Sequence, residues 1–204
     1  MVNSSSADFL HIGYIMLLNG IDAEDGEYGT VMARILHAAQ QKGIKTSIDV
    51  VSESSDSFKK LVIPALRYTD YCTINETEAE QITGIILRDE KEILIKENME
   101  KALRQLKKHG VKKWVTIHSP EGAFGLDDVG NYIFLISKSL PKGFIKDSVG
   151  AGDAFVAGLL YSAYKEIDYK TALSIADAAA IMSLSEFGAT AGVCSIEKIQ
   201  EQIS

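Results

Sequence analysis

The sequence of 204 residues has few cysteines and no long uncharged apolar run. A membrane-spanning helix needs about 20 consecutive, mostly apolar residues, and no window of the sequence meets this requirement, so none is expected. Cys72 and Cys194 lie far apart, which fits thiols in a reducing cytosol better than a disulfide framework or a zinc site. Residues 1–8 are polar and serine-rich and lack the basic and apolar regions of a secretory signal. We therefore expect a cytoplasmic protein without a membrane partner.

Positive charge is scarce as well. The chain has 21 lysines and arginines against 28 aspartates and glutamates, a net charge of −7 with a pI near 5.1. Proteins that coat DNA or RNA need clustered positive charge, so nucleic acid is not an expected partner. With 46% hydrophobic residues, the chain can still bury a sizeable core.

Strands and helices are expected to alternate along the chain after residue 8. Apolar and β-branched runs predict strands at 9–18, 45–51, 71–74 and 113–118, and an antiparallel hairpin at 123–127 and 132–137. Helical spacing predicts helices at 30–43, 57–67 with an interruption at Pro64, 76–83, 92–109, 153–165, 169–186 and 196–203. This alternation predicts an α/β fold, a three-layer, doubly wound, mainly parallel sheet. No linker divides residues 9–204, which we predict to be one domain behind a polar tail, residues 1–8.

The strongest chemical signal is the segment 147–155, DSVGAGDAF, which precedes an apolar helix. Gly150 and Gly152 flank Ala151, so the backbone can turn tightly and approach a ligand with no Cβ in the way. The first N–H groups of the helix, together with its dipole, form a nest for an anion. Asp153 stands at the same helix start, where a carboxylate can position a hydroxyl and accept its proton late in phosphoryl transfer. A plain helix cap is the alternative, which the flanking Asp147 and the small residues after Asp153 disfavour.

Residues 147–160, DSVGAGDAFVAGLL, resemble the C-terminal signature of the ribokinase-like (PfkB) carbohydrate and nucleoside kinases, and the resemblance continues over the chain from Phe9 onward. It implies an ATP-dependent phosphotransferase that uses Mg²⁺ and acts on a hydroxyl of a sugar or sugar-like small molecule, such as a sugar acid or a nucleoside. It also implies that Asp153 is the catalytic base and that the amides of Gly150, Ala151 and Gly152 receive the developing charge.

A second stretch, Asn75-Glu76-Thr77-Glu78, resembles the family's N-x-x-E motif. The resemblance implies that Glu78 holds Mg²⁺ through water and that Asn75 lies by the nucleotide phosphates. Mg²⁺ keeps most of its waters and needs only one or two carboxylates plus phosphate oxygens, which agrees with this role. Taken alone, the same residues would predict an N-capped, acidic helix start.

Other positions complete the resemblance. It implies that Ile117, Ser119 and Gly122 form the turn around the nucleotide, although Ser119 replaces a glycine of the family; its hydroxyl can donate a hydrogen bond. Asp177 stands where the family carries a polar residue, often Asn, on the adenine side, and because Asp cannot donate, the base preference stays open. The loop 186–189 resembles the one that, with Asp147, holds a monovalent cation such as K⁺ in many members. His118 is expected to end a strand rather than to act in catalysis.

The resemblance covers roughly the last two-thirds of a family member. The N-terminal strands, the lid sheet and the glycine-rich motif that carry most acceptor contacts have no counterpart, so the acceptor stays unnamed. A parallel sheet without those strands exposes backbone and apolar surface. We therefore expect a fragment of a longer protein, a chain completed by a partner or by copies of itself as a homo-oligomer, or a decayed enzyme, and favour the first.

Two other functional classes were weighed against the kinase. A catalytically incomplete nucleotide-binding or oligomerisation module would bind ATP and phosphorylate nothing. A dinucleotide-binding oxidoreductase is disfavoured because the third glycine of G-x-G-x-x-G is missing at Phe155. A P-loop kinase is excluded because the sequence has no G-x-x-x-x-G-K-[ST].

Overall fold

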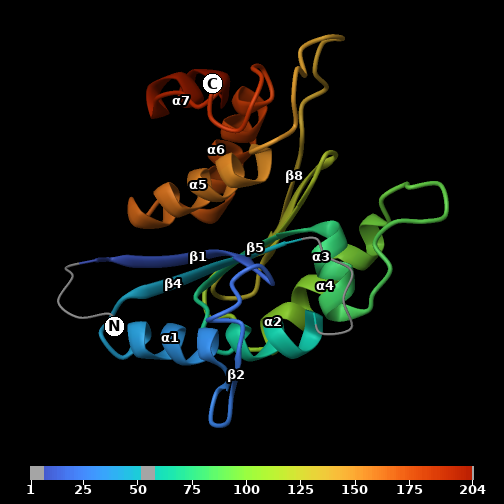
Figure 1. The fold of residues 1–204 in the computed structure, drawn as a ribbon. Coiled ribbons are helices and arrows are strands. Elements are labelled where there is room, and N and C mark those ends of the chain that lie inside the picture. The colour runs from blue at the N-terminus through green and yellow to red at the C-terminus, as the bar shows by residue number, and fades with distance from the viewer. Residues whose placement is uncertain (1–6, 52–57, 204) are drawn as a thin grey trace. The chain divides into compact units, whose positions relative to one another are not determined.

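The computed structural model describes residues 7–51 and 58–203, which form two compact units (Figure 1). The first unit contains Met1–Ile117 and Phe124–Tyr132, and the second contains His118–Ala123 and Ile133–Ser204. Each unit is described by itself below. Most of the predicted polar tail, residues 1–8, lies outside the described residues.

A six-stranded sheet has the order β1-β4-β5-β6-β7-β8. Its strands are β1 (Phe9–Ile15), β4 (Lys45–Val50), β5 (Tyr71–Asn75), β6 (Val115–Ser119), β7 (Gly122–Leu126) and β8 (Tyr132–Ile136). β4 pairs in parallel with both β1 and β5. The predicted hairpin is present between β7 and β8, where Asp127 N donates to Asn131 O at 3.2 Å. The predicted α/β class with a mainly parallel sheet is therefore confirmed.

β1 differs from the prediction in its burial. The run 9–18 was expected to be a buried strand, yet of β1 only Ile15 is fully buried. β1 is an edge strand of the described sheet, with β4 as its neighbour, so the rest of its side chains are partly or largely exposed. The acidic stretch that follows, expected as a loop, contributes to a short antiparallel ribbon of β2 (Glu24–Asp25) and β3 (Gly29–Thr30).

In its described residues, the first unit carries the helices α1 (Val31–Gln40), α2 (Phe58–Leu66), α3 (Glu76–Thr83) and α4 (Lys96–Lys108). α1 begins where predicted, because Thr30 Oγ1 accepts a hydrogen bond from Ala33 N at 3.1 Å. α3 ends where predicted, at Gly84, whose φ of 72° is left-handed. The predicted interruption of α2 was wrong. The helix runs through Pro64, which removes one backbone donor without ending the last turn.

α4 begins at Lys96 rather than at the predicted Glu92. Asp89 Oδ1 accepts hydrogen bonds from the backbone N–H groups of Lys91 and Ile93, at 2.8 and 2.9 Å. A side chain that satisfies its own neighbouring backbone in this way competes with helix formation, so the helix starts only after this turn.

In the hydrophobic core of the first unit, the apolar faces of the helices pack against the strands. Its fully buried members include Leu36 and Met32 of α1, Ile48 of β4, Val62 of α2, Ile74 of β5, Leu103 of α4 and Ile117 of β6. Burying side chains of this size stabilises the fold by about 1.5–3 kcal/mol each, which fixes the ends of β4 and β5.

The second unit contains α5 (Ala151–Tyr164), α6 (Tyr169–Ser183) and α7 (Ile196–Ile203), drawn in orange to red in Figure 1. α5 and α6 approach so closely that a Cβ on Gly158 would lie 2.7 Å from the Cα atom of Ala176. Asp168 caps α6 by accepting a hydrogen bond from Thr171 N at 3.0 Å. This helix pair gives the start of α5 a rigid base.

Candidate active site

Hydrogen bonds to the Asp147 carboxylate hold the turn that leads into α5. Asp147 accepts hydrogen bonds from Val149 N at 3.1 Å and from Gly188 N at 2.9 Å. These backbone donors, Gly188 first, lower the pKa of the Asp147 carboxyl, so Asp147 is ionised at neutral pH. One carboxylate oxygen therefore holds the turn and the other holds the loop 186–189, so Asp147 joins the two.

Gly150 is the N-cap of α5 and has a φ of 84°, a left-handed conformation that disfavours any residue with a side chain. A Cβ at this position would lie 2.4 Å from the carbonyl oxygen of Ala189. α5 has no side-chain cap, so none of its first amides is satisfied by a capping side chain. The backbone does occupy one of these donors, since Ala151 N donates to the carbonyl oxygen of Ser148 at 3.3 Å.

Gly152 differs from the other glycines near this helix start. A Cβ on Gly152 would have the ring atoms of His118 as its nearest neighbours, at 3.6 and 3.9 Å, which is ordinary van der Waals contact. Packing therefore explains the glycine at positions 150 and 158 but not the one at 152. An alanine in a helix is more stable than a glycine by about 0.5–1 kcal/mol, so a function other than folding is indicated for Gly152.

Asp153 is the acidic residue in the first turn of α5, and its side chain is exposed. The structure thus brings Gly150, Ala151, Gly152 and Asp153 together at one helix end, as predicted, with Asp147 in the turn before it. A carboxylate beside backbone donors can accept a proton while the donors face developing negative charge.

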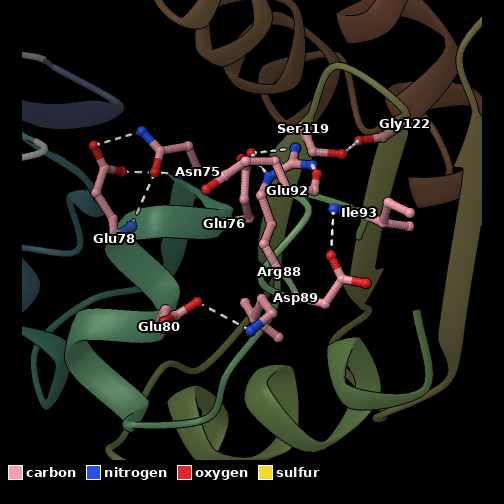
Figure 2. Close-up of polar contacts among 11 residues, drawn as sticks. Asn75, Glu76, Glu78, Glu80, Arg88, Asp89, Glu92, Ile93, Ser119 and Gly122 are labelled. Carbon is pink, nitrogen blue, oxygen red and sulfur yellow. Dashed lines mark hydrogen bonds and ion pairs between the residues drawn. The ribbon is translucent and has the colours of Figure 1, made fainter. Parts of the chain in front are cut away.

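The turn between β6 and β7 also belongs to the second unit. Ser119 Oγ donates to the carbonyl oxygen of Gly122 at 3.3 Å (Figure 2). Gly122 has a φ of 153°, and a Cβ there would lie 2.1 Å from the carbonyl oxygen of Leu135 on β8. Gly122 is therefore required by strand packing, and Ser119 closes the turn. The side chain of Ile117 is fully buried in the core of the first unit, so that side chain has a packing role.

Asp177 lies in the middle of α6 and accepts a hydrogen bond from Ser137 Oγ at 2.5 Å. Burial raises the pKa of the Asp177 carboxyl, while the Ser137 hydrogen bond and the charge of Lys138 oppose that rise. The one hydroxyl proton of Ser137 is used in this bond, which holds the Asp177 carboxyl in place.

In the first unit, Asn75 and Glu78 form a reciprocal cap at the start of α3 (Figure 2). Asn75 Oδ1 accepts from Glu78 N at 2.9 Å, and Glu78 Oε2 accepts from Asn75 N at 2.9 Å. Glu78 Oε1 accepts from Asn75 Nδ2 at 2.8 Å. The carboxylate of Glu78 is thereby held in one orientation, although it is almost fully buried. Sequence reasoning alone would have predicted this cap, and the structure has it.

The other acidic residues of α3 have partners of their own. Arg88 Nε donates to Glu76 Oε1 at 2.9 Å in a largely buried ion pair, and its Nη1 donates to the carbonyl of Glu92 at 2.8 Å (Figure 2). Glu80 Oε2 accepts from Leu87 N at 3.0 Å. These contacts hold the segment after α3 and leave Glu78 as the carboxylate placed by the cap.

Asp49, at the end of β4, was missed by sequence reasoning. Burial raises the pKa of the Cys72 thiol, and the negative charges of Asp49 and Glu78 raise it further. The signal was present in the sequence, since Asp49 is the acidic residue near the carboxyl end of the strand 45–51, where α/β sheets bind ligands. No group of three or more His, Cys, Asp or Glu side chains within residues 7–51 and 58–203 could hold a metal ion.

No helix in the described parts of the chain is both long and apolar enough to cross a membrane.

The residues predicted for a site form two sets. Asn75, Glu78 and the added Asp49 lie in the first unit, and the α5 start, the β6–β7 turn and Asp177 lie in the second.

Comparison with known proteins agrees with this geometry. Residues 4–196 match the pattern described as pfkB family carbohydrate kinase. The bifunctional protein HldE of Campylobacter concisus is 31% identical over 170 residues, which are 78% of this chain and 34% of that protein. The chain therefore spans about a third of the length of this curated relative.

Solved structures share the fold. The 2-dehydro-3-deoxygluconokinase of Thermotoga maritima is 24% identical with a TM-score of 0.67, and the similarity covers 85% of this chain and 54% of that one. The aminoimidazole riboside kinase of Salmonella enterica is 18% identical with a TM-score of 0.70, covering 97% of this chain and 63% of that one. The chain spans about half to two-thirds of these structures.

Proposed function

The chain belongs to the pfkB family of carbohydrate kinases, and from this premise we propose that it carries the ATP site and the catalytic base of a phosphotransferase. The reaction moves the γ-phosphoryl group of ATP to a hydroxyl of a sugar or sugar-like small molecule. The two free thiols, Cys72 and Cys194, fit a reducing compartment such as the cytoplasm.

One observation carries the proposal: Gly152 is a helical glycine that packing does not require. The helix start that it shares with Gly150 carries no side-chain cap, and Asp153 is exposed beside it. A missing Cβ, a helix start without a side-chain cap and a carboxylate together suit a phosphate that must come close to the backbone. We assign Asp153 the hydroxyl proton and the amides of Gly150, Ala151 and Gly152 the developing charge.

We assign Mg²⁺ to the carboxylate of Glu78, whose orientation Asn75 fixes, with Asp49 of β4 as a second carboxylate. Mg²⁺ takes one or two carboxylates plus water and phosphate oxygens, and it would neutralise phosphate charge there. Asn75, Ser119 and Asp177 are assigned to the nucleotide. Asp147, whose oxygens already accept two backbone hydrogen bonds, is assigned to the turn and to a K⁺-binding loop.

Binding and chemistry are tested separately. Mg·ATP at 100 times its dissociation constant should stabilise the chain by about 2.7 kcal/mol, measured as a rise in melting temperature. Asp153→Asn should keep this rise and lower the turnover of a sugar acceptor about 10²- to 10⁴-fold. Glu201→Gln, an exposed change on α7, serves as the control and should alter neither.

Two outcomes would contradict the proposal. Normal turnover by Asp153→Asn would remove the assigned base, and no thermal shift at millimolar Mg·ATP would remove the nucleotide site. A second candidate function would be indicated by a thermal shift with Mg·ATP and no turnover of any sugar acceptor. In that case the chain binds Mg·ATP as a nucleotide-binding module, and no acceptor is phosphorylated.

A further inference from the structure

The turn that follows β1 contains the dipeptide Asn19-Gly20, and both residues are exposed. Leu18 O accepts hydrogen bonds from Ile21 N at 2.8 Å and from Asp22 N at 2.9 Å, which closes the turn around the dipeptide. Asp22 Oδ2 accepts a hydrogen bond from Leu18 N at 2.8 Å. The fold therefore holds both ends of the turn and leaves Asn-Gly, a common turn dipeptide, at the surface.

The groups of this dipeptide that can react with each other are both unoccupied. Within residues 7–51 and 58–203, neither the Asn19 side chain nor the Gly20 backbone N–H makes a hydrogen bond. A Cβ on Gly20 would meet no atom within 4 Å, so the surroundings of this residue are open. The Gly20 nitrogen is therefore unhindered beside the side-chain amide of the residue that precedes it.

The other asparagines in the described part of the chain are held by their side chains. Each of them donates a hydrogen bond from Nδ2: Asn75 to Glu78 Oε1 at 2.8 Å, Asn98 to the carbonyl oxygen of Ile86 at 2.9 Å, and Asn131 to Asp127 Oδ2 at 2.8 Å. Each is also followed by a residue with a side chain, which shields the next backbone nitrogen. Asn19 differs from them in both respects.

We propose that Asn19 is a site of deamidation, at which the backbone nitrogen of Gly20 attacks the side-chain amide carbon of Asn19. Because resonance makes a peptide nitrogen a poor nucleophile, it reacts after losing its proton to base, and the attack is helped by its being intramolecular. The new N–Cγ bond closes a cyclic imide, and the Cγ–Nδ2 bond breaks to release ammonia. Water then opens the imide, at Cγ to give aspartate or at the backbone carbonyl carbon to give isoaspartate.

The product changes the turn in charge and in length. Deamidation changes the net charge of the chain from −7 to −8. Isoaspartate also adds a carbon atom to the backbone between Leu18 and Ile21, so we expect loss of the hydrogen bonds that close the turn on Leu18 O. Val51 N, just after β4, donates to Ile15 O at 3.3 Å, so the altered turn adjoins the carboxyl end of the sheet, where α/β proteins bind ligands.

Incubation of the full chain in mildly acidic and in mildly alkaline buffer tests the proposal. Isoelectric focusing measures the charge, and tandem mass spectrometry with electron-transfer fragmentation locates the change and distinguishes isoaspartate from aspartate. Gly20→Ala shields the attacking nitrogen and should fold normally, because its Cβ meets no atom within 4 Å. Asn19→Gln removes the reactive asparagine, and Asn131→Gln is the matched control.

We expect wild type and Asn131→Gln to gain one negative charge per chain at residue 19, faster in alkaline buffer. Gly20→Ala should gain it more slowly, and Asn19→Gln should not gain it. Hydrogen exchange should show that the amides of Ile21 and Asp22 lose their protection in the isoaspartate form.

The same incubation of the wild-type chain in urea separates the effect of the fold from that of the dipeptide. Similar rates at Asn19 in the native and the unfolded chain support the proposal. A native rate more than about tenfold lower would mean that the turn must first open, and it would overturn the proposal. Earlier modification of Asn75, Asn98 or Asn131 in the native chain would overturn it as well. Neither result bears on the proposed function, to which Asn19 and Gly20 are not assigned.

Discussion

Replacement of Gly152 by alanine should separate folding from function, because the two are expected to change in opposite directions. The added methyl group would lie 3.6 Å from His118 Cε1, a contact that needs no rearrangement. Removing a helical glycine should therefore stabilise the chain by about 0.5–1 kcal/mol, which for a chain of this size raises the melting temperature by about 1–4 °C.

The same methyl group should weaken nucleotide binding. It occupies the space through which a phosphate reaches the amides at the start of α5, and loss of one hydrogen bond to a charged group costs about 1.5–3 kcal/mol. The affinity for Mg·ATP should fall about 10- to 100-fold, measured by calorimetry on wild type and Gly152→Ala. Thermal melts of the same samples, without nucleotide, report the gain in stability.

Two neighbouring glycines provide matched controls for this substitution. Gly150→Ala must adopt a left-handed φ and would place Cβ 2.4 Å from Ala189 O, so it should lower stability by at least about 1–2 kcal/mol. Gly158→Ala would press on the Ala176 backbone at 2.7 Å and should also destabilise. If Gly152→Ala bound Mg·ATP as wild type does, or melted at a lower temperature, the reasoning on Gly152 would be refuted.

Two further predictions concern carboxylates. Glu78→Gln places an amide opposite the donors of Asn75, so it should lower stability by about 0.5–2 kcal/mol and weaken the Mg²⁺ dependence of ATP binding. Thermal melts with and without Mg²⁺ measure both effects. An unchanged Mg²⁺ dependence would argue against the metal role of Glu78. Asp177→Asn keeps an acceptor for Ser137 and removes a charge that burial disfavours, so it should raise the melting temperature at pH 7. Because burial raises the pKa of Asp177 in the fold, this gain should be absent below the ordinary carboxyl range and grow as pH rises; a gain that is constant across pH would contradict this account.

Much of the fold was predictable because local signals decide where its elements begin and end. Thr30 and Asn75 cap helices by hydrogen bonds within three residues, and Gly84 ends α3 with a left-handed φ. The start of α4 was not predictable from helical spacing, since Asp89 satisfies the backbone of its own turn. The exposure of β1 was missed for a different reason: burial of a strand depends on its place in the sheet, which an apolar run does not encode.

Only part of the candidate site could be proposed from the sequence. The residues 150–153 could be proposed from the sequence because their chemistry is contiguous, and the structure places them in one turn. Asp49 and Glu78 are separated along the chain, on and just after the neighbouring parallel strands β4 and β5, so a common role for them needed the pairing of these strands.

The two thiols divide the molecule in a way that an experimenter can use. Cys72 lies buried in the first unit, where the negative charges of Asp49 and Glu78 further oppose formation of the thiolate, whereas Cys194 is partly accessible in the second. Since only the thiolate reacts with alkylating reagents, the modification of Cys72 reports opening of the first unit alone. In one mass spectrum of a pulse-labelled sample, the labelled fraction of Cys72 therefore measures opening of the first unit, and the labelled fraction of Cys194 serves as an internal reference.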